Sequence, residues 1–177
     1  RCVFERNEAY RGGALYTQGT SFAPQVGARA NVRDSLFSRN RGVVGGGGVL
    51  FRQNSIPAID NTYTVDGCTF LENDSELGSG AGVLVQELTS STDNVLLVRN
   101  GTFTRNHAMI RGGAVATIAY WLTLGPTEEL VKNSFIRPRL HIASSRFLFN
   151  VADAMGGAVG TSIRSLTADT AAHADTV

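Results

Sequence analysis

The tetrapeptide Phe70-Leu71-Glu72-Asn73 is one copy of a Phe-x-x-Asn motif that occurs five times along the chain. The motif begins at Phe4, Phe37, Phe70, Phe103 and Phe147, and it ends at Asn7, Asn40, Asn73, Asn106 and Asn150. The first four copies are 33 residues apart (37−4, 70−37, 103−70), whereas the last step is 44 residues, 11 more (147−103). Self-similarity at a fixed period of this length indicates stacked repeats, each of which buries its apolar face against its neighbours.

Small and β-branched residues recur at fixed positions before each phenylalanine. Two residues before it stand Cys2, Ser35, Cys68, Gly101 and Ser145, and five before it stand Val32, Val65, Val98 and Ile142. Because strand side chains alternate between faces, both columns can point inward only if the backbone bends between them. The turn-forming pairs Asp66-Gly67 and Asn100-Gly101 lie at that point and favour such a bend.

A glycine-rich cluster follows each asparagine, and a third short apolar stretch follows the cluster. The clusters are residues 12–14, 46–48, 79–81, 112–114 and 156–158. No segment keeps a 3.6-residue period across a repeat, whereas the inward columns are β-branched or aromatic. The sequence therefore predicts an all-β, right-handed parallel β-helix of about four to five rungs, with three short strands in each rung of ~33 residues.

This architecture gives the two motif residues separate structural roles. The phenylalanines should form one buried column at the strand spacing of ~4.8 Å. The asparagines should line an inward-facing corner, where their amide groups can bond backbone groups that water does not reach. Stacked asparagines can also bond to one another.

Composition excludes several classes of partner. The chain has 177 residues, a formal net charge of +1 and 42% hydrophobic residues. This balance predicts no nucleic-acid partner. No apolar run reaches the ~18–20 residues of a membrane-spanning helix, so direct membrane insertion of this segment is not expected either. Residues 1–177 are interpreted as a single β-helix segment and as a piece of a longer repeat protein.

The pairing of Phe-x-x-Asn with Gly-Gly-Ala, strict at residues 12–14, 112–114 and 156–158, resembles the repeats of the chlamydial polymorphic outer membrane proteins. The resemblance extends through all five copies of the motif. It implies a pectin-lyase-like β-helical passenger that is exposed at the cell surface and implicated in adhesion. An extracellular or cell-surface location is therefore expected.

Carbohydrate-active β-helices are the enzymatic alternative, because they place two or three carboxylates on adjacent rungs. The column two residues after each phenylalanine contains Arg6, Arg39, Glu72, Arg105 and Phe149. The column after each asparagine contains Glu8, Arg41, Asp74, His107 and Val151. Neither column stacks carboxylates, which favours a solvated, partly charge-paired ridge. We therefore predict no catalytic residue, cofactor or metal ligand, and a structural or adhesive role. A polysaccharide lyase or glycoside hydrolase fragment stays open as the alternative.

Three kinds of residue are candidates for contacts or modification. Arg6, Arg39 and Arg105 could form a stripe that attracts acidic glycans. Asn100 begins an Asn-Gly-Thr sequon and is a candidate for glycosylation. Cys2 and Cys68 share a column but lie two rungs apart, at ~9.6 Å by the strand spacing, so we predict that they are not linked.

The 11 additional residues of the last step fall within residues 120–139, which include Trp121. An insertion in a repeat array is expected to form a loop on one face, and such loops often bind partners. The alternative is that Trp121 covers part of the core. The apolar columns continue to both ends of the pattern, so the end rungs are expected to contact further rungs of the same protein or a partner chain. Glycans or other surface proteins are the remaining candidate partners.

Overall fold

The structure is a computed structural model that describes residues 1–19, 25–53, 58–88, 91–123 and 139–167. In this part of the chain all regular secondary structure is β, and all strand pairs are parallel. The register joins each residue to the one 33 positions later, so that Phe4 pairs with Phe37 and Phe70 with Phe103. An all-β parallel solenoid with turns of about 33 residues, as the sequence predicted, is therefore confirmed. We name each turn by its phenylalanine, for example the Phe70 turn.

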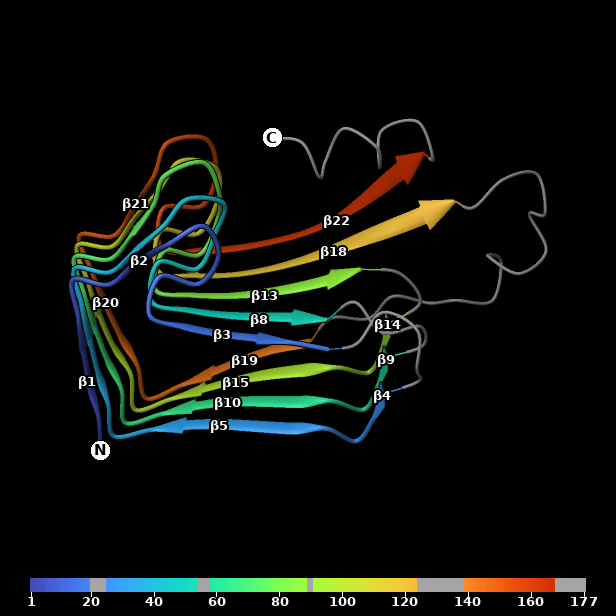
Figure 1. Ribbon diagram of the computed structural model, residues 1–177, viewed down its shortest axis with the longest axis horizontal. Coiled ribbons are helices and arrows are strands. Elements are labelled where there is room, and N and C mark those ends of the chain that lie inside the picture. The colour runs from blue at the N-terminus through green and yellow to red at the C-terminus, as the bar shows by residue number, and fades with distance from the viewer. Residues whose placement is uncertain (20–24, 54–57, 89–90, 124–138, 168–177) are drawn as a thin grey trace.

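Five sheets run along the solenoid (Figure 1). The phenylalanine sheet contains β1 (Val3–Glu5), β6 (Leu36–Ser38), β11 (Thr69–Leu71), β16 (Thr102–Thr104) and β20 (Arg146–Leu148). The ridge sheet contains β2 (Glu8–Ala9), β7 (Arg41–Gly42), β12 (Asp74–Ser75), β17 (His107–Ala108) and β21 (Val151–Ala152). The long-strand sheet contains β3 (Leu15–Gln18), β8 (Val49–Gln53), β13 (Val83–Leu88), β18 (Val115–Thr123) and β22 (Val159–Thr167).

The other two sheets complete each turn. The short sheet contains β4 (Gln25–Val26), β9 (Ala58–Ile59) and β14 (Ser91–Thr92). The valine sheet contains β5 (Arg29–Arg33), β10 (Thr62–Asp66), β15 (Val95–Arg99) and β19 (Arg139–Ala143). Three strands per rung were predicted, and the ridge and short sheets add two more. Their strands are only two residues long, so they carry too little periodicity for a sequence pattern to detect.

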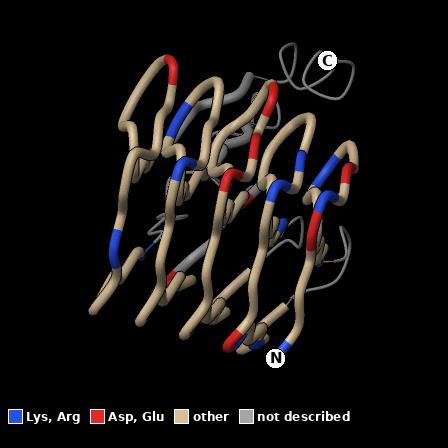
Figure 2. Tube along the Cα trace, turned by 90° about the vertical axis from the view of Figure 1, so that its left-hand side faces the viewer, with Lys and Arg blue, Asp and Glu red and all other residues tan. Residues whose placement is uncertain are grey.

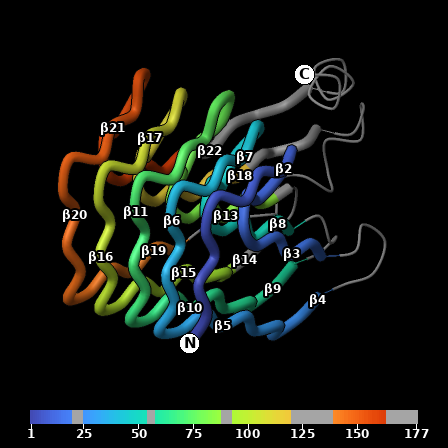
Figure 3. Tube along the Cα trace, turned by 60° about the vertical axis from the view of Figure 1, so that its left-hand side comes forward, coloured from blue at the N-terminus to red at the C-terminus, as the bar shows by residue number. Residues whose placement is uncertain are grey.

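The core lies between the long-strand and valine sheets, closed on one side by the phenylalanine sheet (Figures 1 and 3). The five ladder phenylalanines stack in one column, with ring centroids 4.8 to 4.9 Å apart and planes within 6° of parallel. Phe37, Phe70 and Phe103 are fully buried. Val65 and Val98 reach the same core from the valine sheet, so the two predicted columns do share one interior.

The bend that joins these columns is made by residues in the left-handed backbone region. The residue three before each ladder phenylalanine has a φ between 48° and 61° in four turns, at Asp34, Gly67, Asn100 and Ser144. Asparagine, aspartate and glycine tolerate this conformation better than most residues do. The predicted bend is thus present, at the expected position.

A second apolar cluster lies on the other side of the long-strand sheet, and the sequence analysis missed it. It consists of Leu50, Leu84, Ala116 and Ile118, with Tyr16 packed against them. The glycine-rich loops cover it: a Cβ added at Gly45 would lie 2.5 Å from a methyl carbon of Leu84, and one at Gly46 would lie 2.8 Å from Leu50 Cβ. The glycines therefore permit close packing of the loop over this sheet.

The region of the expected insertion is only partly described. Tyr120, Trp121 and Leu122 lie within β18, which pairs with β22 as far as Thr123. The beginning of the expected loop is therefore strand. Residues 124–138, where the rest of that loop was predicted, lie outside the described residues. Across the described ranges no helix is long and apolar enough to cross a membrane.

Candidate functional site: the charged ridge

The asparagine corner positions the main candidate surface. At this corner the backbone N–H of Asn73 and its Nδ2 both donate to Oδ1 of Asn106, at 3.0 and 2.9 Å. Nδ2 also donates to the carbonyl oxygen of Phe37 at 3.0 Å, so the side chain joins three turns. The same bonds link the corner in the other turns, and they place the flanking residues in straight columns on the outside.

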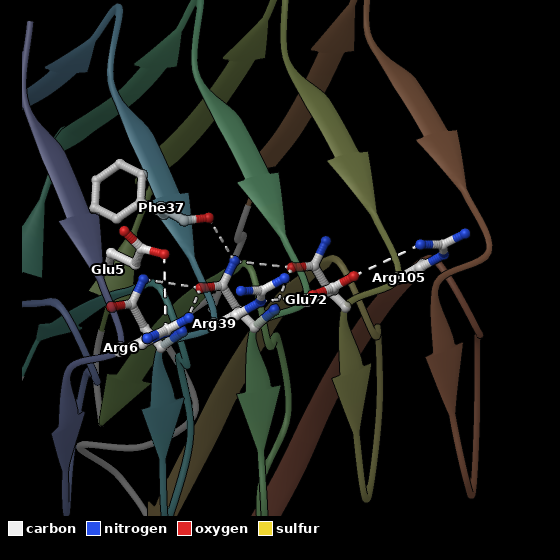
Figure 4. A network of polar contacts seen from close by, with 9 residues as sticks. Glu5, Arg6, Phe37, Arg39, Glu72 and Arg105 are labelled. Atoms are coloured by element: carbon white, nitrogen blue, oxygen red, sulfur yellow. Dashed lines mark hydrogen bonds and ion pairs between the residues drawn. The ribbon is translucent and has the colours of Figure 1, made fainter.

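The first outer column begins two residues after each ladder phenylalanine. All its members have a φ between 53° and 55°, namely Arg6, Arg39, Glu72, Arg105 and Phe149. Figure 4 shows how the first four lie along the outside of the turn. Such a conformation is unfavourable for bulky residues and persists because the corner on both sides fixes it. The sequence gave no indication of this strain, because no glycine marks the position.

Ion pairs join this column across the turns. Arg39 Nε donates to Glu72 Oε2 at 2.9 Å, and Arg105 lies 3.6 Å from the other oxygen of Glu72 (Figure 4). The hydrogen bond from Arg39 lowers the pKa of Glu72 below its ordinary value. Arg6 is 3.8 Å from Glu5. The three arginines of the predicted anion-binding stripe are therefore all paired with carboxylates.

The second outer column follows the asparagines and carries a longer network. Arg41 contacts Glu8 at 3.0 Å, Glu76 at 2.6 Å and Asp74 at 4.0 Å. Asp74 in turn bonds His107 Nδ1 at 2.7 Å. The other ring nitrogen of His107, Nε2, lies 3.0 Å from Asp153. Charges of opposite sign thus follow one another from the Phe4 turn to the Phe147 turn.

Charge is layered by turn over the whole chain. Residues 27–59 contain five arginines and one aspartate, whereas residues 60–92 contain six acidic residues and no lysine or arginine. Residues 93–125 then contain three arginines and one aspartate. Figure 2 shows the result on the ridge, where a turn carrying acidic positions lies between turns carrying basic ones. The ridge is compensated by this layering and offers no continuous basic stripe.

The residues that the structure describes offer no metal centre, since no group of three or more His, Cys, Asp or Glu side chains could hold an ion there. The main buried ionisable group is Glu87 of β13, which is 3% exposed and stacks in register on Gln53. Burial raises the pKa of Glu87 to about 7, although a hydrogen bond with Asn94 opposes the shift. Its Oε2 has no hydrogen-bond partner.

A second asparagine column near Glu87 escaped the sequence analysis. Asn61 donates its backbone N–H to Oδ1 of Asn94 at 2.8 Å, and Oδ1 of Asn61 accepts from the N–H of Ala28 at 2.8 Å. Both asparagines are buried. They are 33 residues apart (94−61), so the alignment contained the signal. With only two copies, the column was too short to stand out.

The remaining candidates lie apart from the ridge. Asn100 is exposed at the bend, and its Nδ2 donates to Asp66 Oδ1 at 2.9 Å. Cys2 is an exposed free thiol and Cys68 a buried one, as expected for unlinked cysteines. Burial raises the pKa of the Cys68 thiol. Trp121 has its backbone in β18, but its side chain lies outside the described residues.

Comparison with known proteins adds no relative. The chain matches no family model, and neither the curated proteins nor the solved structures include a significant match. The resemblance to the chlamydial repeats therefore rests on the motif residues and on the turn length alone.

Proposed function

We propose that this chain is a segment of a right-handed β-helix of four to five rungs in an extracellular or cell-surface protein, related in design to the chlamydial surface passengers. Its role is structural: it forms a rigid stalk that presents loops for adhesion or assembly. The right-handed sense follows from the strong preference for right-handed crossovers between parallel strands.

The observation that carries the proposal is the pair of continuous interior ladders. Stacked phenylalanines and bonded asparagines run through all five turns, and each turn depends on the next for burial and for hydrogen bonds. Such an array is stiff along its axis and can be extended by adding turns. Both properties suit a stalk.

The ridge supports the same interpretation. A glycosidase needs two carboxyl groups about 5 to 9.5 Å apart, with one of them available as an acid. In the two ridge columns the carboxylates of adjacent turns are separated by arginine or histidine, and Glu72 and Asp74 each bond to such a cation. This arrangement favours register and solubility over catalysis.

The end turns are the proposed contacts with further rungs or a partner chain. Phe149 is 77% exposed and Met155 57% exposed on the Phe147 turn, and Val3 is 66% exposed on the Phe4 turn. Apolar strand ends of this kind favour association with another strand layer. We propose that further turns of the same protein contact them, and that the loops in turn contact glycans or other surface proteins.

The test uses the natural protein that contains this segment, produced in its own cells. Antibodies against residues 1–177 should label intact cells, and deletion of the segment should reduce adhesion to host cells or to matrix. A control deletion of residues 124–138 alone tests whether the inserted region is the adhesive part. Absence of labelling on intact cells would overturn the proposed location.

A parallel assay addresses the enzymatic alternative. The purified protein is incubated with acidic and neutral polysaccharides, and the products are examined for new reducing ends and for unsaturated sugars. We expect none. Turnover that is lost on replacing Asp74 or Glu72 would overturn the structural role.

A further inference from the structure

The network that crosses all five turns contains one member that can change its charge near neutral pH. In order along the solenoid it consists of Glu8, Arg41, Asp74, His107 and Asp153. Carboxylates and cations alternate in this order. Arginine stays charged and aspartate stays ionised at neutral pH, whereas histidine titrates near it. His107 is therefore the one variable link between the Phe70 turn and the Phe147 turn.

The geometry around His107 requires a particular protonation state. Its Nδ1 lies 2.7 Å from Asp74 Oδ1 on β12, and its Nε2 lies 3.0 Å from Asp153 Oδ1 just after β21. Carboxylate oxygens accept hydrogen bonds and cannot donate them when ionised. A neutral imidazole has a single N–H and could satisfy only one of the two contacts. Both contacts together require the imidazolium form.

The other groups around the ring are consistent with this assignment. On β21 the register partner of His107 is Val151, which carries no charge. On β7, beyond Asp74, Arg41 lies 4.0 Å from the second oxygen of Asp74 and is itself bonded to Glu76. Arg105 pairs with Glu72 in the neighbouring column. The two carboxylates are therefore the charged groups that face the imidazole.

We propose that protonated His107 is a pH-sensitive clamp that holds the loop following β21 against the two preceding turns. Asp153 is the only charged anchor of that loop in the described ranges, because Phe149 and Val151 replace the charged residues of both outer columns. Loss of the His107 charge breaks the link to Asp153 or to Asp74. The Phe147 turn then loosens while the preceding turns keep their own ladder contacts.

The direction of the pH dependence follows from the same contacts. The hydrogen bond with Asp74, and after it that with Asp153, raises the pKa of His107 above its ordinary value of 6.5. A raised folded-state pKa means that the clamp contributes fully below 6.5 and is lost as the pH rises through the folded-state pKa. The loop should therefore be tighter at pH 5.5 than at pH 8.5.

The test measures the clamp locally, by NMR on the full chain. Hydrogen exchange is followed at the amides of Val151 and Asp153, which donate to the carbonyl oxygens of Asn106 and Ala108. After correction for intrinsic exchange rates, their protection should fall about two- to fivefold between pH 5.5 and pH 8.5. The ring nitrogens of His107 should both be protonated at pH 5.5.

Two variants separate the clamp from general effects of pH. His107→Gln should give low protection at both pH values, and His107→Arg, a permanent cation, should give protection that no longer falls. His141→Gln is the matched control: His141 is exposed on β19 with no ion pair in the described structure, and its loss should leave the pH dependence intact. Equal pH dependence in the wild type and His107→Gln, or a neutral His107 ring at pH 5.5, would overturn the proposal.

Discussion

The interior and the ridge of this solenoid are both built from columns with one side chain per turn, but the two regions follow opposite rules. Inside, like stacks on like: phenylalanine on phenylalanine and asparagine on asparagine. On the ridge, opposite charges alternate, as in Arg39, Glu72 and Arg105. The difference shows what each region needs from its neighbouring turn.

An interior column needs shape and hydrogen-bond complementarity, which identical residues supply. Parallel rings at 4.8 Å exclude water, and an amide is both donor and acceptor, so it complements its own copy. A charged side chain repels its own copy, so the ridge is stable only when the sign changes from turn to turn. The interior therefore encodes the fold, and the ridge encodes which turn lies beside which.

Replacement of an interior phenylalanine should have the largest effect. Phe70→Ala removes a ring that is 0% exposed and stacked on both sides, and we expect it to cost about 3 to 5 kcal/mol of the free energy of unfolding. The control is Phe149→Ala, on an outer column at 77% exposure, which should change stability by about 0.5 kcal/mol or less. Urea unfolding monitored by circular dichroism measures both. Similar costs for the two variants would contradict the distinction between interior and ridge.

The asparagine ladder should come next. Asn73→Ala leaves the carbonyl oxygen of Phe37 and the donors of Asn40 without partners in a buried corner, so we expect a loss of about 2 to 4 kcal/mol. Asn31→Ala, at an exposed position of β5, is the matched control and should be close to neutral. Thermal unfolding of the three proteins side by side provides the measurement. A ladder that tolerates alanine would mean that water reaches the corner.

The buried Glu87 should make stability depend on pH. Because its folded-state pKa of about 7 lies above the ordinary 4.5, its contribution is fully present below pH 4.5 and is lost as the pH rises to about 7. Between pH 5 and pH 8 we expect a loss of about 2 to 3 kcal/mol. Glu87→Gln, which copies the residue Gln53 of the preceding turn, should remove most of this slope and raise stability at pH 8. Urea titrations at several pH values test it; an unchanged slope in the variant would rule out Glu87 as the source.

The ridge should give the smallest effect on overall stability. Glu72→Arg places like charges on three consecutive turns beside Arg39 and Arg105, whereas Glu72→Gln only removes the pairing. Because these side chains are exposed, we expect a melting temperature lower by about 1 to 2 °C for the reversal, and less for the glutamine variant. The difference should shrink in 1 M salt. Restoration of the wild-type value by Arg39→Glu in the Glu72→Arg background would show direct pairing.

The sequence was sufficient for the repeat and its interior. Five copies of Phe-x-x-Asn with a 33-residue step determined the register, the phenylalanine column and the asparagine corner. The phase slip between Val65 and Cys68 determined the bend, because alternation allows no other way to point both residues inward. These features depend on one turn meeting its own copy, so a linear comparison of repeats contains the information.

The tertiary structure was needed wherever different parts of a turn meet. The glycine-rich loops fold over Leu50 and Leu84, and two-residue strands form only because a neighbouring turn lies beside them. His107 meets Asp74 at the same position of the preceding turn, but it meets Asp153, 46 residues away, because Val151 occupies the aligned position. Repeat spacing alone determined the stacking of like residues in this protein. Contacts between unlike residues depend on side-chain reach and loop path, which only the folded chain decides.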